Sequence, residues 1–503
     1  MIPLLFFWTV ILALQVAGVI SFASIGSSSG HPTTTSVVFQ SIQPSTTTYL
    51  SQSLSDSFHE QDEAIQHTSP SRLVSRRNAL VSTLSAIAAT TTTAVSSIPL
   101  PAFAEEQPLT TTSSTTATPQ VVPISAQWKA VDGLNSADKQ FVSFDYRAYQ
   151  AMTQDPNRTP YFQKAIEQRL LTQPENTLTV LDLGTGPFAL FAIMAAQAGA
   201  KHVYAIEADP DICQSARQYA AKSGYADVIT IYEGFSSAVQ LPEKVDLCVA
   251  EIVGSIASEE GAYATIRDAY KRLVKEPQNP DSWIPNRIQT YAAPASYTLH
   301  NLFGPPEFDW NKLGGEPVRF SCQDRGLGLL ADPQLVEDIA FADIMNTNKQ
   351  QPQSTAVTVP QKYQLSFTVD AARMEINQKL LFDEFRRGKS SVTDSQRLAH
   401  ETAHSVTGIA LWPRLTLTNG RKAGDDGSNS FPPIVVDSRH YGDGGYQSSH
   451  WQTVLPIMAA RPVGGLQGGE KVNVQFDFNL PGDNVDQSPS YSIQGTVNYN
   501  ALV

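Results

Sequence analysis

The stretch Thr177-Leu-Thr-Val-Leu-Asp-Leu183, followed by Gly184-Thr-Gly186-Pro-Phe188, decides the fold of this chain. Its first seven residues are rich in apolar and β-branched side chains, which predicts a short buried strand. The apolar residues 189–196 then predict a buried helix. Glycines between a strand and a helix let a ligand approach the backbone at the helix N-terminus. The segment therefore predicts the first unit of a parallel α/β sheet with a nucleotide-like ligand.

The next predicted strand, residues 202–206, is followed by Glu207. An acid at the tip of the second strand can accept hydrogen bonds from both hydroxyls of a ribose. We take Phe188 as the residue that replaces the third glycine of a dinucleotide fingerprint. Two glycines and a ribose acid without that third glycine resemble a class I S-adenosylmethionine-dependent methyltransferase. An NAD-dependent oxidoreductase is the alternative, and Phe188 disfavours it.

Two glutamates, Glu251 and Glu260, lie nine positions apart just after the apolar run 245–249. A strand that ends in a returning loop can direct two carboxylates into one cleft. Such a pair suits a planar cation, because a guanidinium presents its donors as a flat fork. Two solvated acids in an acidic protein are the alternative interpretation.

Together these segments resemble the protein arginine methyltransferases, over roughly residues 140–503. Arg158 is similar to the arginine with which that family binds the carboxylate of its cofactor. Glu207 matches the ribose acid, and Glu251 and Glu260 match the double-glutamate loop. The resemblance implies that both glutamates hold the acceptor guanidinium beside the methyl donor.

A late segment, Ser449-His450-Trp451, resembles the Thr-His-Trp loop of the same family. The resemblance implies that His450 braces the loop or helps to remove a proton, and that Trp451 shapes the pocket. Ser237 stands where the family has an acid for the adenine amino group. The resemblance thus implies two sets of site residues. The catalytic set is Glu251, Glu260, His450 and Trp451, and the cofactor-binding set is Arg158, Asp182, Gly184, Gly186, Glu207 and Ser237.

The implied fold is α/β, with a Rossmann-like methyltransferase domain over residues 176–290 and a mostly antiparallel β-barrel domain over residues 291–503. Residues 127–175 are expected to form an N-terminal helical segment. The implied cofactor is S-adenosyl-L-methionine, and the implied reaction is methyl transfer to arginine guanidino nitrogens of a protein. The alternatives are a catalytically retired methyltransferase fold kept for binding or assembly, and a small-molecule methyltransferase. The family also implies a homodimer, through an arm expected near residues 303–328.

The segment His400-Glu401-Thr-Ala-His404 matches the zinc-protease pattern H-E-x-x-H. On a helix, the two histidines would share one face, and Glu401 would serve as the general base. Residues 405–430 contain no Glu or His that could supply the third ligand, and residues 407–412 predict a strand. A polar helix end beside a barrel strand is therefore preferred, and no metal site is expected.

The composition disfavours two classes of protein, general nucleic-acid binders and cystine-rich scaffolds. The formal net charge is −13, from 48 acidic and 35 basic residues, which argues against general nucleic-acid binding because that role needs a basic face. Three cysteines allow at most one disulfide and exclude a cystine-rich scaffold. This composition fits a soluble protein and weakly favours cationic partners. The family resemblance implies a protein substrate with an exposed arginine as the partner.

The N-terminal region predicts a series of targeting signals. Residues 1–21 are apolar and predict a signal peptide, with a membrane anchor as the alternative. Residues 22–104 predict plastid transit and twin-arginine targeting, because the start at Phe22 resembles the transit peptides of secondary plastids. The twin arginines, Arg76 and Arg77, precede an apolar stretch and a small-x-small cleavage site ending at residue 104.

This order of signals predicts delivery to the thylakoid lumen of a plastid, without stable membrane insertion after processing. A secreted or membrane-anchored protein is the alternative. Residues 105–126 are mostly rich in Thr and Pro and predict a disordered linker, so that folded structure is expected to begin near Gln127.

Overall fold

The computed structural model describes residues 38–39, 120–130, 146–172, 174, 176–306, 308–310, 316–321, 325–345, 358–420, 431–439, 449–481 and 488–499. All of them belong to one compact unit of the chain. The predicted signal peptide, and the predicted targeting region except residues 38–39, lie outside the described residues. None of the described helices has both the length and the apolar character needed to cross a membrane.

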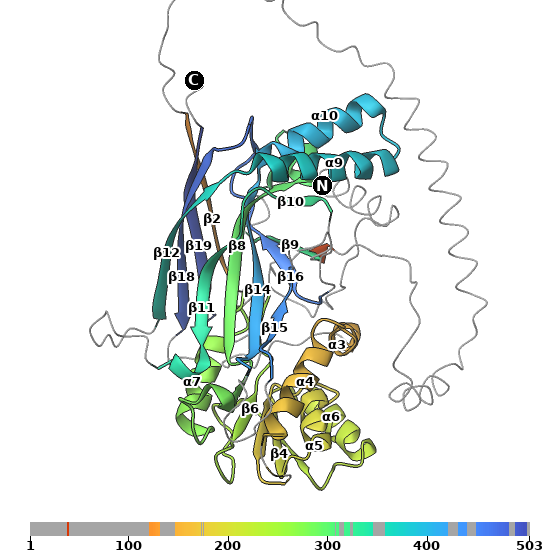
Figure 1. Cartoon of the computed structure of the whole chain (residues 1–503), viewed down its shortest axis with the longest axis vertical. Helices are drawn as coiled ribbons and strands as arrows, with labels where there is room; N and C mark the ends of the chain where they lie inside the picture. Colours follow the sequence, from red (N-terminus) through yellow and green to blue (C-terminus); the bar gives the residue numbers. More distant parts are fainter. Residues whose placement is uncertain are drawn as a thin grey trace, which may run out of the picture. The chain divides into compact units, whose positions relative to one another are not determined.

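The predicted Rossmann-like domain is present as a five-stranded parallel sheet in the order β5-β4-β3-β6-β7. Every residue of the central strand β3 is buried, as expected for a parallel sheet whose two faces are covered. The strands are β3 (Thr179–Leu183), β4 (His202–Glu207), β5 (Ile229–Glu233), β6 (Leu247–Val249) and β7 (Trp283–Ile284). The helices are α3 (Tyr146–Thr153), α4 (Thr159–Leu170), α5 (Leu190–Gln197), α6 (Pro210–Lys222) and α7 (Ala262–Arg272) (Figure 1).

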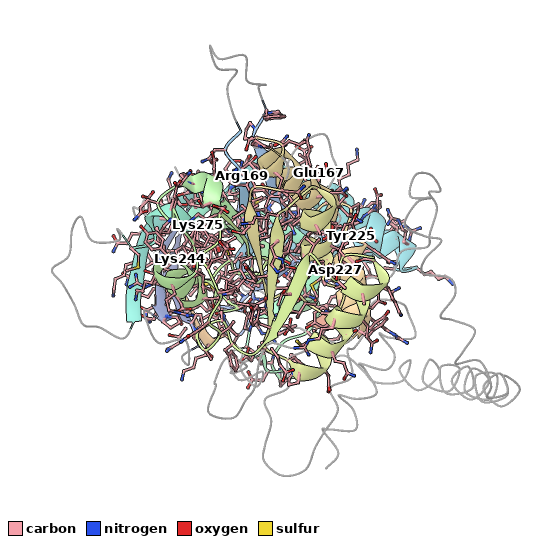
Figure 2. The ribbon with its side chains drawn as sticks, turned by 90° about the horizontal axis from the view of Figure 1, so that it is seen from below. Glu167, Arg169, Tyr225, Asp227, Lys244 and Lys275 are labelled. Atoms are coloured by element: carbon pink, nitrogen blue, oxygen red, sulfur yellow. The ribbon has the colours of Figure 1, made fainter. Side chains whose placement is uncertain are left out.

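The two ends of this sheet differ in chemistry. Figure 2 views the end at which the strands begin, and its labelled side chains are Glu167, Arg169, Tyr225, Asp227, Lys244 and Lys275. At this end Lys275 Nζ lies 2.9 Å from Asp246 Oδ2, an ordinary surface ion pair. The carboxyl ends of the strands lie at the opposite edge, where ligands of open α/β sheets bind.

The second domain is built mostly from antiparallel strands, as predicted. An eight-stranded sheet has the order β1-β9-β16-β14-β8-β10, with β11 on β8 and β15 on β14, and a four-stranded sheet has the order β12-β18-β19-β2. Among the described residues, this pairing forms open sheets and not one closed ring of strands. Alternate residues of β18 are buried, as expected for a strand with one face on the core.

The strands of the larger sheet are β1 (Val38–Phe39), β8 (Arg287–Tyr297), β9 (Val318–Ser321), β10 (Leu327–Leu329), β11 (Gln334–Ala340), β14 (Gly408–Thr418), β15 (Ile434–Asp437) and β16 (Gln452–Leu455). Those of the smaller sheet are β2 (Val121–Lys129), β12 (Thr358–Thr368), β18 (Lys471–Pro481) and β19 (Ser490–Asn498). Strands β13 (Ser405–Val406) and β17 (Val463–Gly464) form a separate pair. The pairs within the two large sheets are antiparallel except β1 with β9, which is parallel.

Strand β2 corrects the predicted N-terminal boundary. Residues 121–126 were assigned to the disordered linker and residues 127–129 to the helical segment, yet they form one strand paired with β19. Two apolar side chains on one face, Ile124 and Trp128, are buried, and Trp128 stacks on Tyr491 with ring centroids 5.4 Å apart. The polar composition around this alternation hid it. Pro123 is tolerated because β2 is an edge strand.

The remaining helices lie mostly in the second domain. Helices α9 (Ala371–Arg387) and α10 (Val392–Ala403) pack against each other as a hairpin between β12 and β13 (Figure 1). A short helix α8 (Thr298–Leu302) and the 3-10 turns η4 (Pro280–Ser282) and η6 (Phe341–Asp343) complete the described helical segments. The described part of the predicted dimer arm, near residues 303–328, includes β9 and the first two residues of β10.

A continuous hydrophobic core joins the two domains. Val180 and Leu181 of the parallel sheet belong to the same buried cluster as Ile288 of β8 and Leu415 of β14. Because this cluster crosses the boundary, the carboxyl edge of the parallel sheet is held against the second domain.

Candidate active site

The turn after β3 is shaped by two glycines. Gly184 and Gly186 have φ values of +79° and +67°, a backbone region that favours glycine. A Cβ atom on Gly184 would lie 3.0 Å from Cγ2 of Ile252. The amide of Gly186 donates a hydrogen bond of 3.0 Å to Oε2 of Glu207, at the end of β4. The predicted glycine turn and the predicted ribose acid therefore meet at the carboxyl edge of the sheet.

Two other predicted cofactor residues are placed differently. Asp182 is buried beneath the turn, where it accepts hydrogen bonds from the hydroxyl of Thr185 at 2.6 Å and the amide of Ala192 at 2.9 Å. Burial raises the pKa of Asp182 to about 6. This carboxyl group therefore holds the turn and the start of α5. Ser237 lies exposed in the turn after β5, at the same edge of the sheet.

Phe188 belongs to an aromatic cluster beside the glycine turn. Its ring packs edge-on against Tyr146 of α3, at 5.5 Å, and against Tyr219 of α6, at 5.0 Å. A Cβ atom on Gly186 would lie 3.7 Å from the ring of Tyr149, so α3 lies directly against the turn. Phe188 thus contacts two helices. The third glycine of the G-x-G-x-x-G spacing that starts at Gly184 falls on Ala189, so the assignment of Phe188 to that position was wrong. Two further aromatic residues that precede α3 in the sequence, Phe141 and Phe144, lie outside the described residues.

Arg158 and Glu251 are in direct contact. Arg158 lies at the start of α4 and is 6% exposed. Its Nε donates to Oε2 of Glu251 at 2.8 Å, its Nη2 contacts the same oxygen, and its Nη1 donates to the carbonyl of Met152 at 3.1 Å. The guanidinium also lies 4.9 Å from the ring centre of Phe191. The structure therefore joins the predicted cofactor-binding arginine to the first glutamate of the double-glutamate loop.

Glu260 lies in the same charged cluster. Burial and the neighbouring carboxylates of Glu251 and Glu259 raise the pKa of Glu260 to about 8, against the opposing effect of Arg319 and Arg158. An effect of this kind requires Glu251 and Glu260 to lie near each other. The second carboxylate of the loop therefore lies within electrostatic range of the first.

The His-Trp loop contacts both halves of the site. The amide and Nδ1 of His450 each lie 2.8 Å from Oδ2 of Asp155, in the turn before Arg158. Nε1 of Trp451 donates to the carbonyl of Val253 at 2.7 Å, inside the double-glutamate loop. Trp451 is 2% exposed, so its indole braces this loop from the second domain.

Three residues of the second domain hold the middle of the double-glutamate loop, and the sequence analysis did not single them out. Thr290 of β8 accepts from the amide of Ala257 at 2.9 Å, and Glu337 of β11 accepts from the amide of Ser258 at 3.3 Å. The hydroxyls of Ser258 and Tyr491 lie 3.0 Å apart. These residues come from strands far apart in the sequence, and no local pattern marks them. Asp155 was missed too, although its place three residues before Arg158 was a usable signal.

The zinc-protease pattern lies at the end of α10, where ring nitrogens of both histidines contact oxygen atoms of other residues. His404 Nδ1 lies 2.7 Å from the carbonyl oxygen of Leu466, and its Nε2 lies 3.2 Å from Oε1 of Gln378. The same amide oxygen lies 3.3 Å from Nδ1 of His400. Glu401 pairs with Arg397 at the surface. Across the described part of the chain, no three His, Cys, Asp or Glu side chains are arranged to hold a metal ion.

Comparison with known proteins gives one matching family model and several related sequences. The family described as "Ribosomal protein L11 methyltransferase (PrmA)" matches residues 162–266. Protein arginine N-methyltransferase 1 of Oryza sativa subsp. indica is 28% identical over 239 residues, which cover 45% of this chain and 58% of the relative. Protein arginine N-methyltransferase PRMT10 of Oryza sativa subsp. japonica is 36% identical over 137 residues, covering 26% and 34% of the two chains. The chain thus spans little more than half the length of the first of these relatives.

Two solved structures are similar at low sequence identity. One is the Trypanosoma brucei PRMT1 enzyme–prozyme heterotetrameric complex with AdoHcy, with a TM-score of 0.46 and 16% identity, covering 71% of this chain and 98% of the other. The other is the open conformation of Arabidopsis thaliana protein arginine methyltransferase 10, with a TM-score of 0.46 and 16% identity, covering 71% and 99%.

Proposed function

We propose that this chain, a member of the protein arginine methyltransferase family, transfers methyl groups to arginine side chains of a protein. The observation that carries the proposal is the return of Glu251 and Glu260 to one charged cluster beside the glycine turn. Glu251 already holds one guanidinium there, that of Arg158. A site with this charge and geometry suits a second guanidinium from an acceptor.

The residues at the carboxyl edge fit S-adenosylmethionine, the cofactor of this family. The glycine turn brings bare backbone to the ligand edge. Glu207, which is held by the amide of Gly186, would accept hydrogen bonds from the ribose hydroxyls, and Arg158 would bind the cofactor carboxylate. When bound, the cofactor supplies an electrophilic methyl group on a sulfonium. Because Arg158 also contacts Glu251, this one side chain would link the cofactor site to the acceptor site.

The two glutamates would orient the acceptor. A guanidinium is a poor nucleophile because its lone pairs are delocalised and it stays protonated at neutral pH. Glu251 and Glu260 can hold it flat and stabilise positive charge on its distal nitrogens, which leaves one nitrogen turned towards the methyl donor. Catalysis of this kind depends on orientation and on fixed charges that need no rearrangement.

His450 is suited to accept the proton that the acceptor must lose. Burial lowers the pKa of His450, against the opposing effect of the Asp155 carboxylate, so the ring is neutral at pH 7. Asp155 receives the hydrogen bond of Nδ1, which leaves Nε2 as the basic nitrogen. We assign proton removal to Nε2 and the fixing of the ring to Asp155.

The test uses the full chain, labelled S-adenosylmethionine, and an arginine peptide with its lysine counterpart. Label on the arginine peptide alone is expected, with a loss of about 100-fold or more in Glu251→Gln and Glu260→Gln. This loss corresponds to about 3 kcal/mol for one charge-assisted contact. Glu401→Gln, at the surface of α10, is the matched control and should keep full activity. Transfer to the lysine peptide, or full activity in both loop variants, would overturn the proposal.

One observation favours a second candidate function. Ser237 is exposed and uncharged where the family has an acid for the adenine amino group, which is compatible with a weakened cofactor site. A retired methyltransferase fold, kept for binding or assembly, would then show no transfer to any acceptor and weak or no cofactor binding. Tight cofactor binding without transfer to peptides would instead favour a small-molecule acceptor.

We also propose delivery to the thylakoid lumen, on the order of signals in residues 1–104. Fusion of this segment to a fluorescent protein should place it inside plastids. Changing Arg76 and Arg77 together to Lys should stop the fusion in the stroma. Secretion of the fusion, or its retention in a membrane, would support the alternative address.

A further inference from the structure

A second arginine, which no sequence motif marks, acts in the charged cluster of Glu251, Glu260 and Arg158. Arg319 on β9 contacts Glu259, the residue immediately before Glu260. Its Nη1 donates to Oε2 of Glu259 at 3.0 Å, and its Nη2 contacts Oε1, so the guanidinium spans both carboxylate oxygens. The two side chains are 15% and 8% exposed. This pair is therefore shielded from the solvent that weakens surface ion pairs.

The cluster divides its charges in a simple way. Arg158 is paired with Glu251, and Arg319 is paired with Glu259. Among the described residues, no salt bridge joins Glu260 to a basic side chain. The cluster therefore contains three carboxylates and two guanidinium groups. Glu260 is the carboxylate at which a third cation could bind.

We propose that Arg319 is a positioning residue of the acceptor site, which orients and neutralises Glu259 so that Glu260 can carry a negative charge to the guanidinium of the acceptor. This inference rests on the proposed function. Arg319 acts through Glu259 and not by direct contact with the acceptor.

Glu259 and Glu337 both hold the backbone of the double-glutamate loop: Glu259 accepts from the amide of Ile256 at 3.4 Å, and Glu337 accepts from the amide of Ser258 at 3.3 Å. The pKa of Glu337 is raised mainly by burial and in part by the charge of Glu259. An unpaired Glu259 carboxylate would leave a buried negative charge that acts on both Glu260 and Glu337. Glu260 would then keep its proton to a higher pH and bind a cation less well. The charged groups that act on Glu260 are Glu251, Glu259, Arg158 and Arg319.

Arg319 also belongs to the same sheet as the His-Trp loop. Strand β9 pairs antiparallel with β16, which starts immediately after Trp451, and Arg319 lies opposite Val454. The strand that carries Arg319 is therefore fixed beside the loop that carries His450. Arg319 therefore holds Glu259 from a strand that is fixed in a sheet outside the double-glutamate loop.

The test compares the pH dependence of kcat/KM for peptide methylation in two single variants. Arg319→Gln leaves Glu259 uncompensated and should move the acidic limb of the profile to higher pH by about one unit or more. Glu259→Gln leaves Arg319 uncompensated and should move the same limb to lower pH. The double variant should return the limb towards its original position. A pair that is merely structural would lower activity in both variants without opposite shifts.

Two further variants control for folding. Arg287→Gln breaks another arginine–carboxylate pair, with Asp338 across β8 and β11, and should leave the limb unmoved. Arg319→Lys keeps the charge and loses the second hydrogen bond, so it should keep the limb and raise KM. If Arg319→Gln does not fold, Arg319→Lys and Glu259→Gln still decide the matter, because an unshifted limb in Glu259→Gln contradicts the proposal.

Binding of agmatine, a small guanidinium compound, separates this inference from the proposed function. Calorimetry without cofactor should show agmatine binding that strengthens as the pH rises, with the same opposite shifts in the two variants. Shifts in agmatine binding without any methyl transfer would overturn the proposed function and keep the role of Arg319. Methyl transfer without opposite shifts would overturn the role of Arg319 alone. Absence of both binding and transfer would overturn both.

Discussion

His450 and Asp155 are 295 positions apart in the sequence and meet at one carboxylate oxygen. Both the backbone amide and Nδ1 of His450 lie 2.8 Å from Oδ2 of Asp155. Asp155 is 5% exposed, so this contact is largely shielded from water. It fastens a loop of the second domain to the turn that leads into Arg158. The relative position of proton acceptor and cofactor-binding arginine therefore depends on this pair.

Asp155→Asn should lower kcat by roughly 10- to 100-fold with little loss of fold. The amide nitrogen can donate to Nδ1 and favour the other tautomer, which leaves Nε2 protonated and unable to accept a proton. The measurement is steady-state methyl transfer, with Asp332→Asn at the surface as the control. A normal kcat in Asp155→Asn would show that His450 is not the proton acceptor.

The same pair makes a prediction about acid stability. Burial raises the pKa of Asp155, but the hydrogen bonds from His450 outweigh it, and the pKa lies below its ordinary value of 3.8. A depressed carboxyl pKa gives stability that is present above the unfolded value and is lost as the pH falls through the folded value. Asp155→Asn should therefore destabilise the protein at pH 6, and unfolding curves should show this difference shrink as the pH falls below 3.8.

Glu260→Gln should stabilise the fold while it abolishes transfer. The pKa of Glu260 rises from 4.5 to about 8, so the folded state holds this proton more tightly than the unfolded state. Stability is therefore lost as the pH rises from about 4.5 to about 8. A glutamine has no such loss and should gain about 1 to 2 kcal/mol at pH 8, after allowance for solvent screening.

Thermal unfolding at pH 5 and pH 8 checks this prediction. The Tm of Glu260→Gln should exceed that of the natural chain by a few degrees at pH 8, with a smaller difference at pH 5. Glu401→Gln, whose residue lies exposed on α10, provides the baseline for an ordinary surface glutamate. An equal Tm difference at both values would contradict the assigned titration of Glu260.

Gly184→Ala should weaken cofactor binding, whereas Gly224→Ala should not. Both glycines have nearly the same φ, +79° and +80°, so both substitutions cost about 1–2 kcal/mol of stability. A Cβ atom at 184 would press on Ile252, next to Glu251, whereas a Cβ at 224 meets nothing within 4 Å. Calorimetry with S-adenosylmethionine should show a loss of about tenfold or more for Gly184→Ala alone. Similar affinities in the two variants would place the cofactor elsewhere.

The His400–His404 segment should bind no stoichiometric zinc. Metal analysis of the purified chain, with protease assays before and after EDTA, measures this directly. His404→Gln should cost about 1 kcal/mol of stability, because it loses the contact with the carbonyl of Leu466. One zinc per chain that disappears in His400→Gln would instead establish a metal site at the end of α10.

The sequence predicted the parallel sheet closely because its signals are local. The strand expected at 177–183 is observed as Thr179–Leu183, and the one expected at 202–206 as His202–Glu207. The apolar run and the two glycines lie within twelve consecutive residues, and backbone preference acts over that range. Strand β2 was not predicted, because only two of its nine residues are both buried and apolar.

Short sequence motifs identified the residues of the site, whereas the tertiary structure decided which of these residues contact one another. The spacing of Glu251 and Glu260 and the His450-Trp451 pair could be read from short motifs. The pairing of Arg158 with Glu251, of Asp155 with His450 and of Arg319 with Glu259 could not. Electrostatic energy depends on the distance between charges in space, and folding alone decides which distant segments come within that distance. Local sequence therefore determined which groups are available, and packing of the two domains decided which of them act on one another.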